Sequence, residues 1–228
     1  MMRRRGLLAG GPLALIATAE AAAASPVVLE LFTSQGCSSC PPADALLGQL
    51  ARRTGVIALA WHVDYWDRLG WRDPFASRFG TELQKSYAAA LGSEVFTPAL
   101  VVNGATVLVG SDRRAIEAAL VKAAPLPVPV TLTRTSDGVD IAVGPVPGRV
   151  WAQSIVYDPE RSTDVRAGEN EGTQLREYRI VRAVEKLAEW DAGGRNFRTP
   201  LPQPGQGLAV VVQSPELRML GAGDLPPG

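Results

Sequence analysis

Phe32-Thr33-Ser34-Gln35-Gly36-Cys37-Ser38-Ser39-Cys40-Pro41-Pro42 is the stretch around which the chain is organised, because it holds both cysteines at Cys-x-x-Cys spacing. An apolar run, Val27-Val28-Leu29, precedes it, and a helix-like pattern follows it. Two thiols three residues apart, at the junction of a buried strand and a helix, are typical of a redox motif. The sequence therefore predicts a dithiol–disulfide site at this junction.

The composition leaves these two cysteines free for chemistry. A chain of 228 residues is long enough to bury a sizeable core without disulfide staples. Its 23 basic and 23 acidic residues balance, so bulk charge does not favour nucleic acid or an anionic membrane as a partner. We expect no nucleic-acid partner and no cofactor.

The N-terminus has the pattern of an export signal over residues 1–24. Arg3-Arg4-Arg5 is a positive start, residues 7–17 are a short apolar stretch, and residues 19–24 are a small-residue cleavage zone. Arg4-Arg5 also resembles a twin-arginine signal, so the Sec and twin-arginine routes both stay open. We expect a periplasmic or secreted protein with no membrane span after cleavage, in which the cysteines can rest as a disulfide or a dithiol.

The first half of the mature chain reads as an α/β domain, residues 25–124. Apolar periodicity and turn signals predict strands and helices in the order β-α-β-α-β-β-α, which is the order of the thioredoxin fold. The predicted elements are a strand at 26–32, a helix from Pro41, a strand at 56–63, a helix in the later part of 71–91, a hairpin of 99–102 with 106–109, and a helix at 111–123.

A proline-rich link starting at Pro125 separates this domain from a β-rich accessory domain, residues 125–228. Alternating patterns predict a sandwich-like unit, and the tail from Gly221 is expected to be frayed. The segment 167–172 reads as an ordinary polar turn with no chemistry to assign. The predicted strands are 130–134, 139–143, 150–157, 175–189 and 208–213.

Strand order predicts which segments meet at the cysteines. The carboxyl ends of parallel strands lie at one edge of a sheet, which brings Cys37 and the segment 62–66 together. The strand after Pro98 is expected to be antiparallel and to begin at the same edge. Cys37, at a helix N-terminus, is predicted to be an exposed nucleophile with a lowered pKa, and Cys40 the less exposed resolving thiol.

Other side chains near this edge are candidates for substrate binding. Pro98 is predicted to form a cis peptide bond that faces the cysteines, with Thr97 beside it. Trp61, Trp66 and Trp71, with Tyr65, are candidate walls of a substrate groove, although aromatic side chains more often serve in core packing. Asp64 is a further candidate for substrate binding.

Glu30 and His62 are candidate proton-transfer groups. Glu30 interrupts an apolar strand, so burial would raise its pKa, and it could relay the proton of Cys40; alternatively it faces solvent or pairs with an arginine. His62 is the chain's one histidine, and a lone histidine after an apolar strand is more often a hydrogen-bonded packing residue.

The leading hypothesis is a thiol–disulfide oxidoreductase acting on protein thiols or disulfides, or on an unknown redox partner. One rival is a non-catalytic binding module in which Cys37 and Cys40 form a structural disulfide. A second rival is a soft-metal carrier, for example of copper, that uses the two thiolates. A closed metal site is disfavoured, because four ligands are usual and only His62 adds to the cysteines unless Asp64 or Asp67 joins.

Several segments of the chain resemble a family of exported bacterial proteins named domain of unknown function 1223. The resemblance covers nearly all of the mature chain, and the motif around the cysteines is highly specific. It implies a thioredoxin-like fold and an exported location, but no activity, because the role of the family is not established. The segments that carry it are Glu30 to Asp44, His62 to Asp67, Gly70-Trp71, Thr97-Pro98, Gly168-Glu169-Asn170 and Val181-Arg182.

Overall fold

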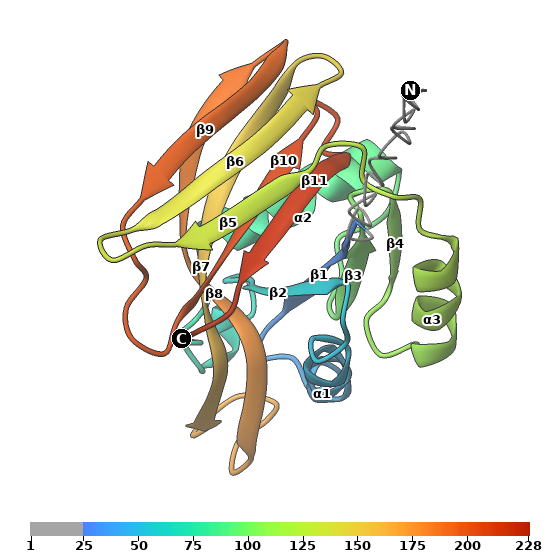
Figure 1. The fold of residues 1–228 in the computed structure, drawn as a ribbon. Helices are drawn as coiled ribbons and strands as arrows, with labels where there is room; N and C mark the ends of the chain where they lie inside the picture. The colour runs from blue at the N-terminus through green and yellow to red at the C-terminus, as the bar shows by residue number, and fades with distance from the viewer. Residues whose placement is uncertain (1–24) are drawn as a thin grey trace, which may run out of the picture.

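The computed structural model describes residues 25–228, so the predicted signal segment 1–24 lies outside the described residues. The chain forms an eight-stranded mixed sheet with helices on its faces and a second, three-stranded sheet (Figure 1). The predicted α/β class is confirmed. Between residues 25 and 228 no helix is both long and apolar enough to cross a membrane.

The first half has the predicted order of elements, with boundaries close to those expected. Its elements are β1 (Val27–Thr33), α1 (Pro41–Leu50), β2 (Val56–His62), the short 3₁₀ helix η1 (Asp67–Leu69), α2 (Arg78–Leu91), β3 (Ala99–Val102), β4 (Thr106–Val109) and α3 (Arg113–Lys122).

Strand β1 is buried on both faces, which explains its nearly continuous apolar sequence. It pairs in parallel with β2 and antiparallel with β3. Leu29 and Leu31 pack on the face that α1 and α3 cover, while Val28 and Phe32 pack on the opposite face, against Tyr87 of α2. The alternation of side chains along β1 therefore decides which helix each residue meets.

The second half consists of strands. They are β5 (Val130–Arg134), β6 (Val139–Val146), β7 (Val150–Asp164), β8 (Gln174–Trp190), β9 (Gly193–Thr199), β10 (Gly207–Gln213) and β11 (Met219–Leu225). Five of these seven strands were predicted, while β9 and β11 were not.

The large sheet runs across both halves of the chain. Its strand order is β11-β10-β7-β8-β2-β1-β3-β4, and the two halves join where Ala60 of β2 pairs in parallel with Ile180 of β8. The division into two domains at residue 124 stays a prediction, but strands from before and after that residue belong to one sheet.

The small sheet, β5-β6-β9, lies against the β7 and β10 part of the large sheet (Figure 1). Side chains of Val139, Ile141 and Val143 on β6 form a core with Val150 of β7 and Val210 of β10. The second half therefore has the predicted sandwich-like layering, but one of its two layers is shared with the first half.

The prediction of a frayed tail from Gly221 is wrong. Residues 221–223 belong to β11, which pairs with β10 at the edge of the large sheet. The strand was missed because Gly221 and Gly223 lack the side chains that make an apolar pattern. They are needed there, since a Cβ on Gly221 would lie 2.4 Å from the carbonyl oxygen of Val128.

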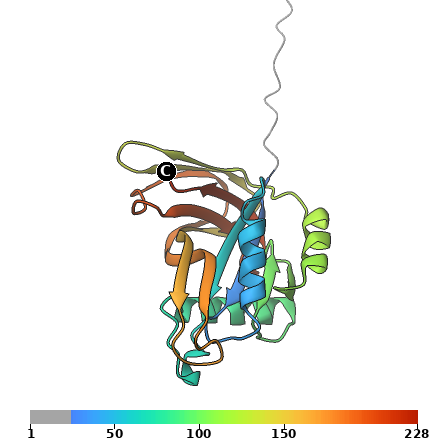
Figure 2. The ribbon, with the colours of Figure 1, turned by 90° about the horizontal axis from the view of Figure 1, so that it is seen from below.

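Strands β7 and β8 extend well beyond the rest of the sheet. The pairing of β7 with β10 ends at Tyr157, while its pairing with β8 continues to Asp164, opposite Gln174. We call the two-stranded extension, residues 158–180 with its connecting loop, the β7–β8 arm. Figure 2 shows the arm running beside α1.

The β3–β4 turn gives a test of the fold. Asn103 and Gly104 both have positive φ, 49° and 62°, as the predicted hairpin requires. A Cβ on Gly104 would also lie 2.1 Å from the carbonyl oxygen of Leu217. Gly104→Ala is expected to lower the free energy of unfolding, measured in urea, by about 2 kcal/mol or more.

Gly148→Ala is the matched control for that substitution. A Cβ on Gly148 would have no heavy atom within 4 Å, so the change should stay within about 0.5 kcal/mol. Equal effects of the two substitutions would contradict the described contact between the β3–β4 and β10–β11 turns.

Candidate functional site

The two cysteines form a disulfide at the start of α1. Cys40 is the N-cap residue of α1, Pro41 and Pro42 follow in its first turn, and the Cα atoms of Cys37 and Cys40 lie 5.5 Å apart. The backbone N–H of Cys40 donates to the carbonyl of Cys37 at 3.1 Å, which closes the turn between them. Proline at the start of a helix loses no needed hydrogen bond, so the motif sets the helix start directly after the disulfide.

The predicted exposure of Cys37 is wrong. Cys37 and Cys40 are both 0% exposed, and only Ser38 and Ser39 between them reach solvent. The sequence around the pair carries no sign of this burial.

The predicted cis peptide bond between Thr97 and Pro98 is present at the start of β3. The hydroxyl of Ser39 donates to the carbonyl of Thr97 at 3.5 Å, and the indole N–H of Trp66 donates to the Thr97 hydroxyl at 2.8 Å. A Cβ on Gly36 would lie 3.0 Å from the Cβ of Trp66. The structure thus brings Thr97 and Trp66 next to the disulfide turn.

Gln35, two residues before Cys37, connects two other segments to the disulfide turn. Its side-chain oxygen accepts from the indole N–H of Trp71 at 3.0 Å, and its side-chain amide donates to Glu177 of β8 at 2.7 Å. Its backbone N–H donates to Asp73 at 2.9 Å. The sequence did not single out Gln35, Asp73 or Glu177, and nothing local distinguishes them from ordinary polar residues.

His62 lies in a buried cluster beside this connection. Its Nδ1 is 2.7 Å from a carboxylate oxygen of Asp73, and its Nε2 is 3.8 Å from Glu177. Burial lowers the pKa of His62, but the charge and hydrogen bond of Asp73, together with the charges of Glu177 and Asp44, outweigh it and raise the pKa to about 9. His62 is therefore protonated near neutral pH and reaches the disulfide turn through Asp73 and Gln35.

Asp44 is the acid on α1 that faces this cluster, and it was missed as a candidate. It lies one helical turn after Cys40, and its backbone N–H donates to the Cys40 carbonyl at 3.1 Å. Burial raises the pKa of Asp44 to about 8, against the opposing effect of the His62 charge. A helix residue four positions after a cysteine shares its face, and this spacing is the signal that could have found it.

Glu30 is buried, as one of the two interpretations held, but it lies away from the cysteines. It alternates with Leu29 and Leu31, so its side chain is on the α2 face of the sheet, where it accepts from the Tyr87 hydroxyl at 2.5 Å and the Trp61 indole at 3.1 Å. Burial raises the pKa of Glu30 to about 7, and both hydrogen bonds oppose this shift.

Asp64 and Tyr65 are not in the hydrogen-bonded surroundings of the disulfide. Asp64 accepts from the hydroxyl of Thr81 on α2 at 2.6 Å. Together the two residues line an open cavity of about 650 Å³ whose other lining residues include Arg68, Arg78 and Lys85. They lie beside the predicted site, on the α2 side of Trp66.

The loop at the tip of the β7–β8 arm is the unexpected part of the site. The side-chain amide of Asn170 donates to the carbonyls of Gln35 and Cys37, at 2.9 and 3.0 Å. The backbone N–H of Ser38 donates to the carboxylate of Glu169 at 3.0 Å. The prediction of an ordinary polar turn is thus wrong, and only the family resemblance pointed to these residues.

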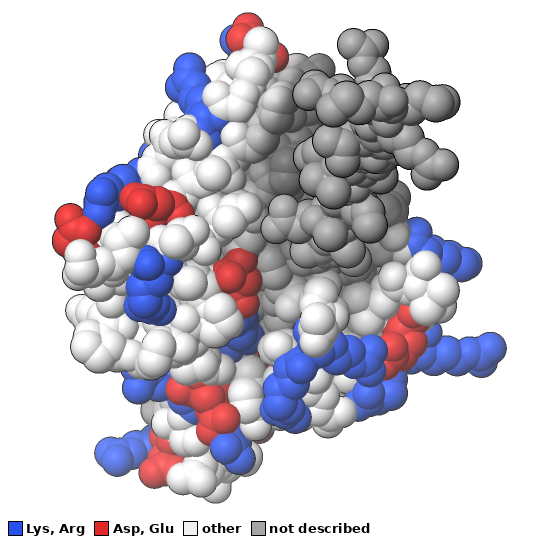
Figure 3. Space-filling view, in the orientation of Figure 1, with Lys and Arg blue, Asp and Glu red and all other residues white. Residues whose placement is uncertain are grey.

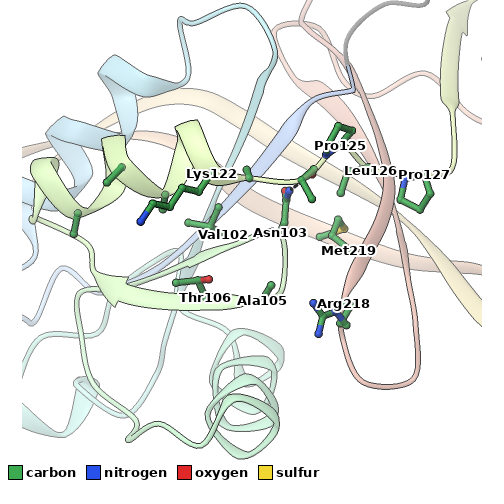
Figure 4. A pocket seen from close by; sticks show the side chains of 15 residues that line it. Val102, Asn103, Ala105, Thr106, Lys122, Pro125, Leu126, Pro127, Arg218 and Met219 are labelled. Atoms are coloured by element: carbon green, nitrogen blue, oxygen red, sulfur yellow. Dashed lines mark hydrogen bonds between the residues drawn. The ribbon is translucent and has the colours of Figure 1, made fainter.

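A second cavity, of about 580 Å³, lies at the other end of β3 from Pro98 (Figure 4). The side chains of Thr106, Lys122 and Arg218 lie around it, and neither cysteine is among its lining residues.

Basic and acidic side chains are both spread over the described part of the face in Figure 3. Among residues 25–228, no three His, Cys, Asp or Glu side chains are arranged to hold a metal ion.

Comparisons with known proteins found one family match and several similar solved structures. The family described as "Protein of unknown function (DUF1223)" matches residues 28–213. A crystal structure of a protein from Agrobacterium tumefaciens is similar, with 32% identity, a TM-score of 0.78, and coverage of 90% of this chain and 96% of that chain. HBP35 of Porphyromonas gingivalis, at 15% identity, shares the fold with a TM-score of 0.63, over 90% of this chain and 76% of that one. No curated protein matches.

The buried carboxyl of Glu30 makes stability depend on pH. Its pKa rises from 4.5 to about 7 on folding, so the folded protein binds a proton that the unfolded chain has lost. This contribution to the free energy of unfolding is full below pH 4.5 and is lost as the pH rises through 7. Urea unfolding at pH 5 and pH 8 should show lower stability at pH 8; Asp44 and His62, whose pKa values are also raised, act in the same direction.

Glu30→Gln should remove about 3 kcal/mol of that difference, since one pKa unit corresponds to about 1.4 kcal/mol. Glu216→Gln, an exposed change in the β10–β11 turn, is the control and should leave the pH dependence as it is. An unchanged pH dependence in Glu30→Gln would show that Glu30 is already ionised in the folded protein.

Proposed function

The chain belongs to the DUF1223 family of proteins of unknown function, and we propose that it is an exported thioredoxin-like protein that exchanges thiols and disulfides through Cys37 and Cys40. The observation that carries this proposal is the Cys37–Cys40 disulfide at the start of α1, with the cis Thr97–Pro98 peptide one hydrogen bond away from Ser39. The substrates are protein thiols or disulfides.

The arrangement of the first half supports a thioredoxin-like fold. Strands β2, β1, β3 and β4 are neighbours in that order, with β2 parallel to β1 and with β3 antiparallel to it. Helices α1 and α3 pack on one face and α2 on the other. The cysteines follow β1, and Pro98 precedes β3, so both lie at the same edge of the sheet, as such a fold requires.

The exchange is balanced in atoms and electrons. A substrate thiolate attacks Sγ of Cys37, the bond to Cys40 breaks, and Cys40 leaves as a thiolate. A second substrate thiolate then displaces Cys37, so the substrate gains a disulfide and the protein gains two thiols. The same steps in reverse reduce a substrate disulfide, with Cys37 as nucleophile and Cys40 as resolving thiol.

The buried cluster on the same side of the sheet is proposed to donate a proton to Cys40 when Cys40 leaves as a thiolate, and to accept it in the reverse reaction. Asp44 lies one turn from Cys40 and carries a proton near neutral pH, because its pKa is about 8. His62 holds a second proton beside it. Glu30, on the opposite face and bound to Tyr87, is a poor candidate for this role.

Trp66, Thr97 and Trp71 are proposed as the walls that a substrate segment meets. Trp66 and Trp71 each use the indole N–H to hold a loop beside the cysteines, through Thr97 and Gln35 respectively. Both side chains are partly exposed, so a substrate segment can reach them. Asp64 and Tyr65 would contribute only to a substrate that extends toward α2.

A second candidate is a non-catalytic binding module that keeps Cys37–Cys40 as a structural disulfide. The burial of both sulfurs favours it. It predicts a reduction potential below about −300 mV, an unreactive Cys37, and loss of partner binding in Trp66→Ala.

A soft-metal carrier is a third candidate, and the absence of stoichiometric Cu(I) uptake by the reduced protein would eliminate it.

Export is part of the proposal and rests on residues 1–24. An oxidising compartment would keep the Cys37–Cys40 pair as a disulfide between turnovers, whereas cytoplasmic thiols would reduce it. Fractionation of cells that produce the full chain tests this point: the processed protein should be recovered from the periplasm or the medium.

A mixed-disulfide trap tests the exchange reaction. In Cys40→Ser the resolving thiol is gone, so a substrate joined to Cys37 cannot be released. Export of this variant in its native host should yield disulfide-linked adducts on a non-reducing gel that disappear with dithiothreitol. Mass spectrometry of the adducts identifies the substrates.

Cys37→Ser is the control, because it retains one cysteine but removes the proposed nucleophile, and it should yield few or no adducts. Adducts in equal amount from both variants would point to nonspecific oxidation of an unpaired thiol. Absence of adducts from both, with normal folding, would favour the structural disulfide.

A further inference from the structure

The β7–β8 arm ends in a loop with a defined internal structure. Beyond Tyr157 the arm has only two strands, so it stands outside the rest of the sheet. Within its loop, the N–H of Val165 donates to Thr173 and the N–H of Gly172 donates back to Val165. The N–H of Thr173 also donates to the carbonyl of Asn170. These bonds hold the loop in one shape, so that it can move as a unit with the arm.

The tip of this loop holds the peptide group between Cys37 and Ser38 from both sides. Its carbonyl accepts from the side chain of Asn170, and its N–H donates to the carboxylate of Glu169. Asn170 also donates to the carbonyl of Gln35. Gly168 lies against Trp71, since a Cβ there would be 3.2 Å from the Trp71 Cβ.

A second set of contacts fixes the arm along α1. A Cβ on Gly48 would lie 2.4 Å from the ring of Tyr178, so the arm touches the helix backbone there. Glu177, the neighbour of Tyr178, accepts from the Gln35 side chain at 2.7 Å and is 1% exposed. The arm therefore runs beside α1 and meets the disulfide turn at its end.

We infer that the tip of the β7–β8 arm, Gly168-Glu169-Asn170, is a cap that limits access of thiols to the Cys37–Cys40 disulfide, and that Asn170 keeps it closed. A thiolate must approach Sγ of Cys37, which is 0% exposed and lies 3.3 Å from the hydroxyl of Ser39. The tip does not touch the sulfur but holds the turn that buries it, through the carbonyl of Cys37 and the N–H of Ser38. On this inference the tip must move away before the turn can open and the sulfur can react. Asn170 acts as a positioning residue, because it touches the backbone of the turn and not the sulfur.

This inference deepens the proposed exchange function by giving that site its access control. Small thiols meet the disulfide only during the fraction of time in which the cap is open. A protein substrate that displaces the tip gains access by its own binding. The cap therefore favours protein substrates over free low-molecular-weight thiols.

The rate of reduction by dithiothreitol tests the cap. One thiolate of dithiothreitol attacks Cys37 Sγ, Cys40 leaves, and the second thiolate closes the dithiothreitol disulfide, so two electrons pass to the protein. Asn170→Asp keeps the shape of the side chain but removes both N–H donors. Its two lost hydrogen bonds should raise the second-order rate constant at least about 10-fold. Free thiols are counted by mass spectrometry after acid quenching and alkylation.

Two further variants form a matched pair. Glu169→Ala removes the acceptor of the Ser38 N–H and should raise the rate, while Glu171→Ala changes the same residue type in the same loop but removes no contact with the turn. Glu169→Ala also keeps the test decisive if Asn170→Asp does not fold. A cap alters the forward and reverse rates alike, so the rise in rate should exceed any change in the equilibrium constant for reduction of the same variant.

A wild-type rate in Asn170→Asp, or an equal rise in Glu171→Ala, would overturn the inference. So would a rise that matches a loss in the free energy of global unfolding, since reduction would then occur through the unfolded protein. The dithiothreitol rate does not require a protein substrate. Failure of the cap is therefore distinguished from failure of the exchange function, which the Cys40→Ser trap tests separately.

Discussion

The parallel pairing of Ala60 with Ile180 is the contact on which the rest of the site depends. It attaches β8 to the edge of the β1–β4 part of the sheet. The positions of the residues before Ile180, which include Glu177 and the loop that precedes β8, are fixed by this attachment. Glu177 comes to lie beside His62, and the loop before β8 comes to lie on the disulfide turn. Without this pairing, the two halves of the chain would share neither a sheet nor a site.

The buried charges of the site are organised around Asp73. Its carboxylate accepts from the backbone N–H groups of Gln35 and Phe75 and from His62. Burial raises the pKa of Asp73, but the His62 charge and these hydrogen bonds outweigh it and lower the pKa. Burying a charge costs less when its hydrogen-bonding groups are satisfied, and the N–H groups of Gln35 and Phe75 provide this for Asp73, whereas Nε2 of His62 has no hydrogen-bond partner among the described residues. The tryptophan-rich segment thus supports the disulfide turn as well as packing against it.

Local sequence patterns predicted most of the fold and the centre of the site. The alternation in β1, the apolar stripe of α1 and the Asn103-Gly104 turn depend on neighbours in sequence, and these elements were found. Strand β11 was missed because Gly221 and Gly223 carry no pattern. The partners of Cys37 were missed because Asn170 reaches it through a strand pairing that joins residues more than one hundred positions apart.

His62 is the protein's one histidine, and it is bound through Asp73 to the segment that carries the cysteines. Its imidazole therefore gives the protein's one set of histidine ring signals in a nuclear magnetic resonance spectrum, and these need no label beyond the isotope. Any change in the disulfide turn that alters Asp73 or Gln35 changes the field at that ring. The protein carries its own spectroscopic reporter, placed two hydrogen bonds from the turn that holds the sulfurs.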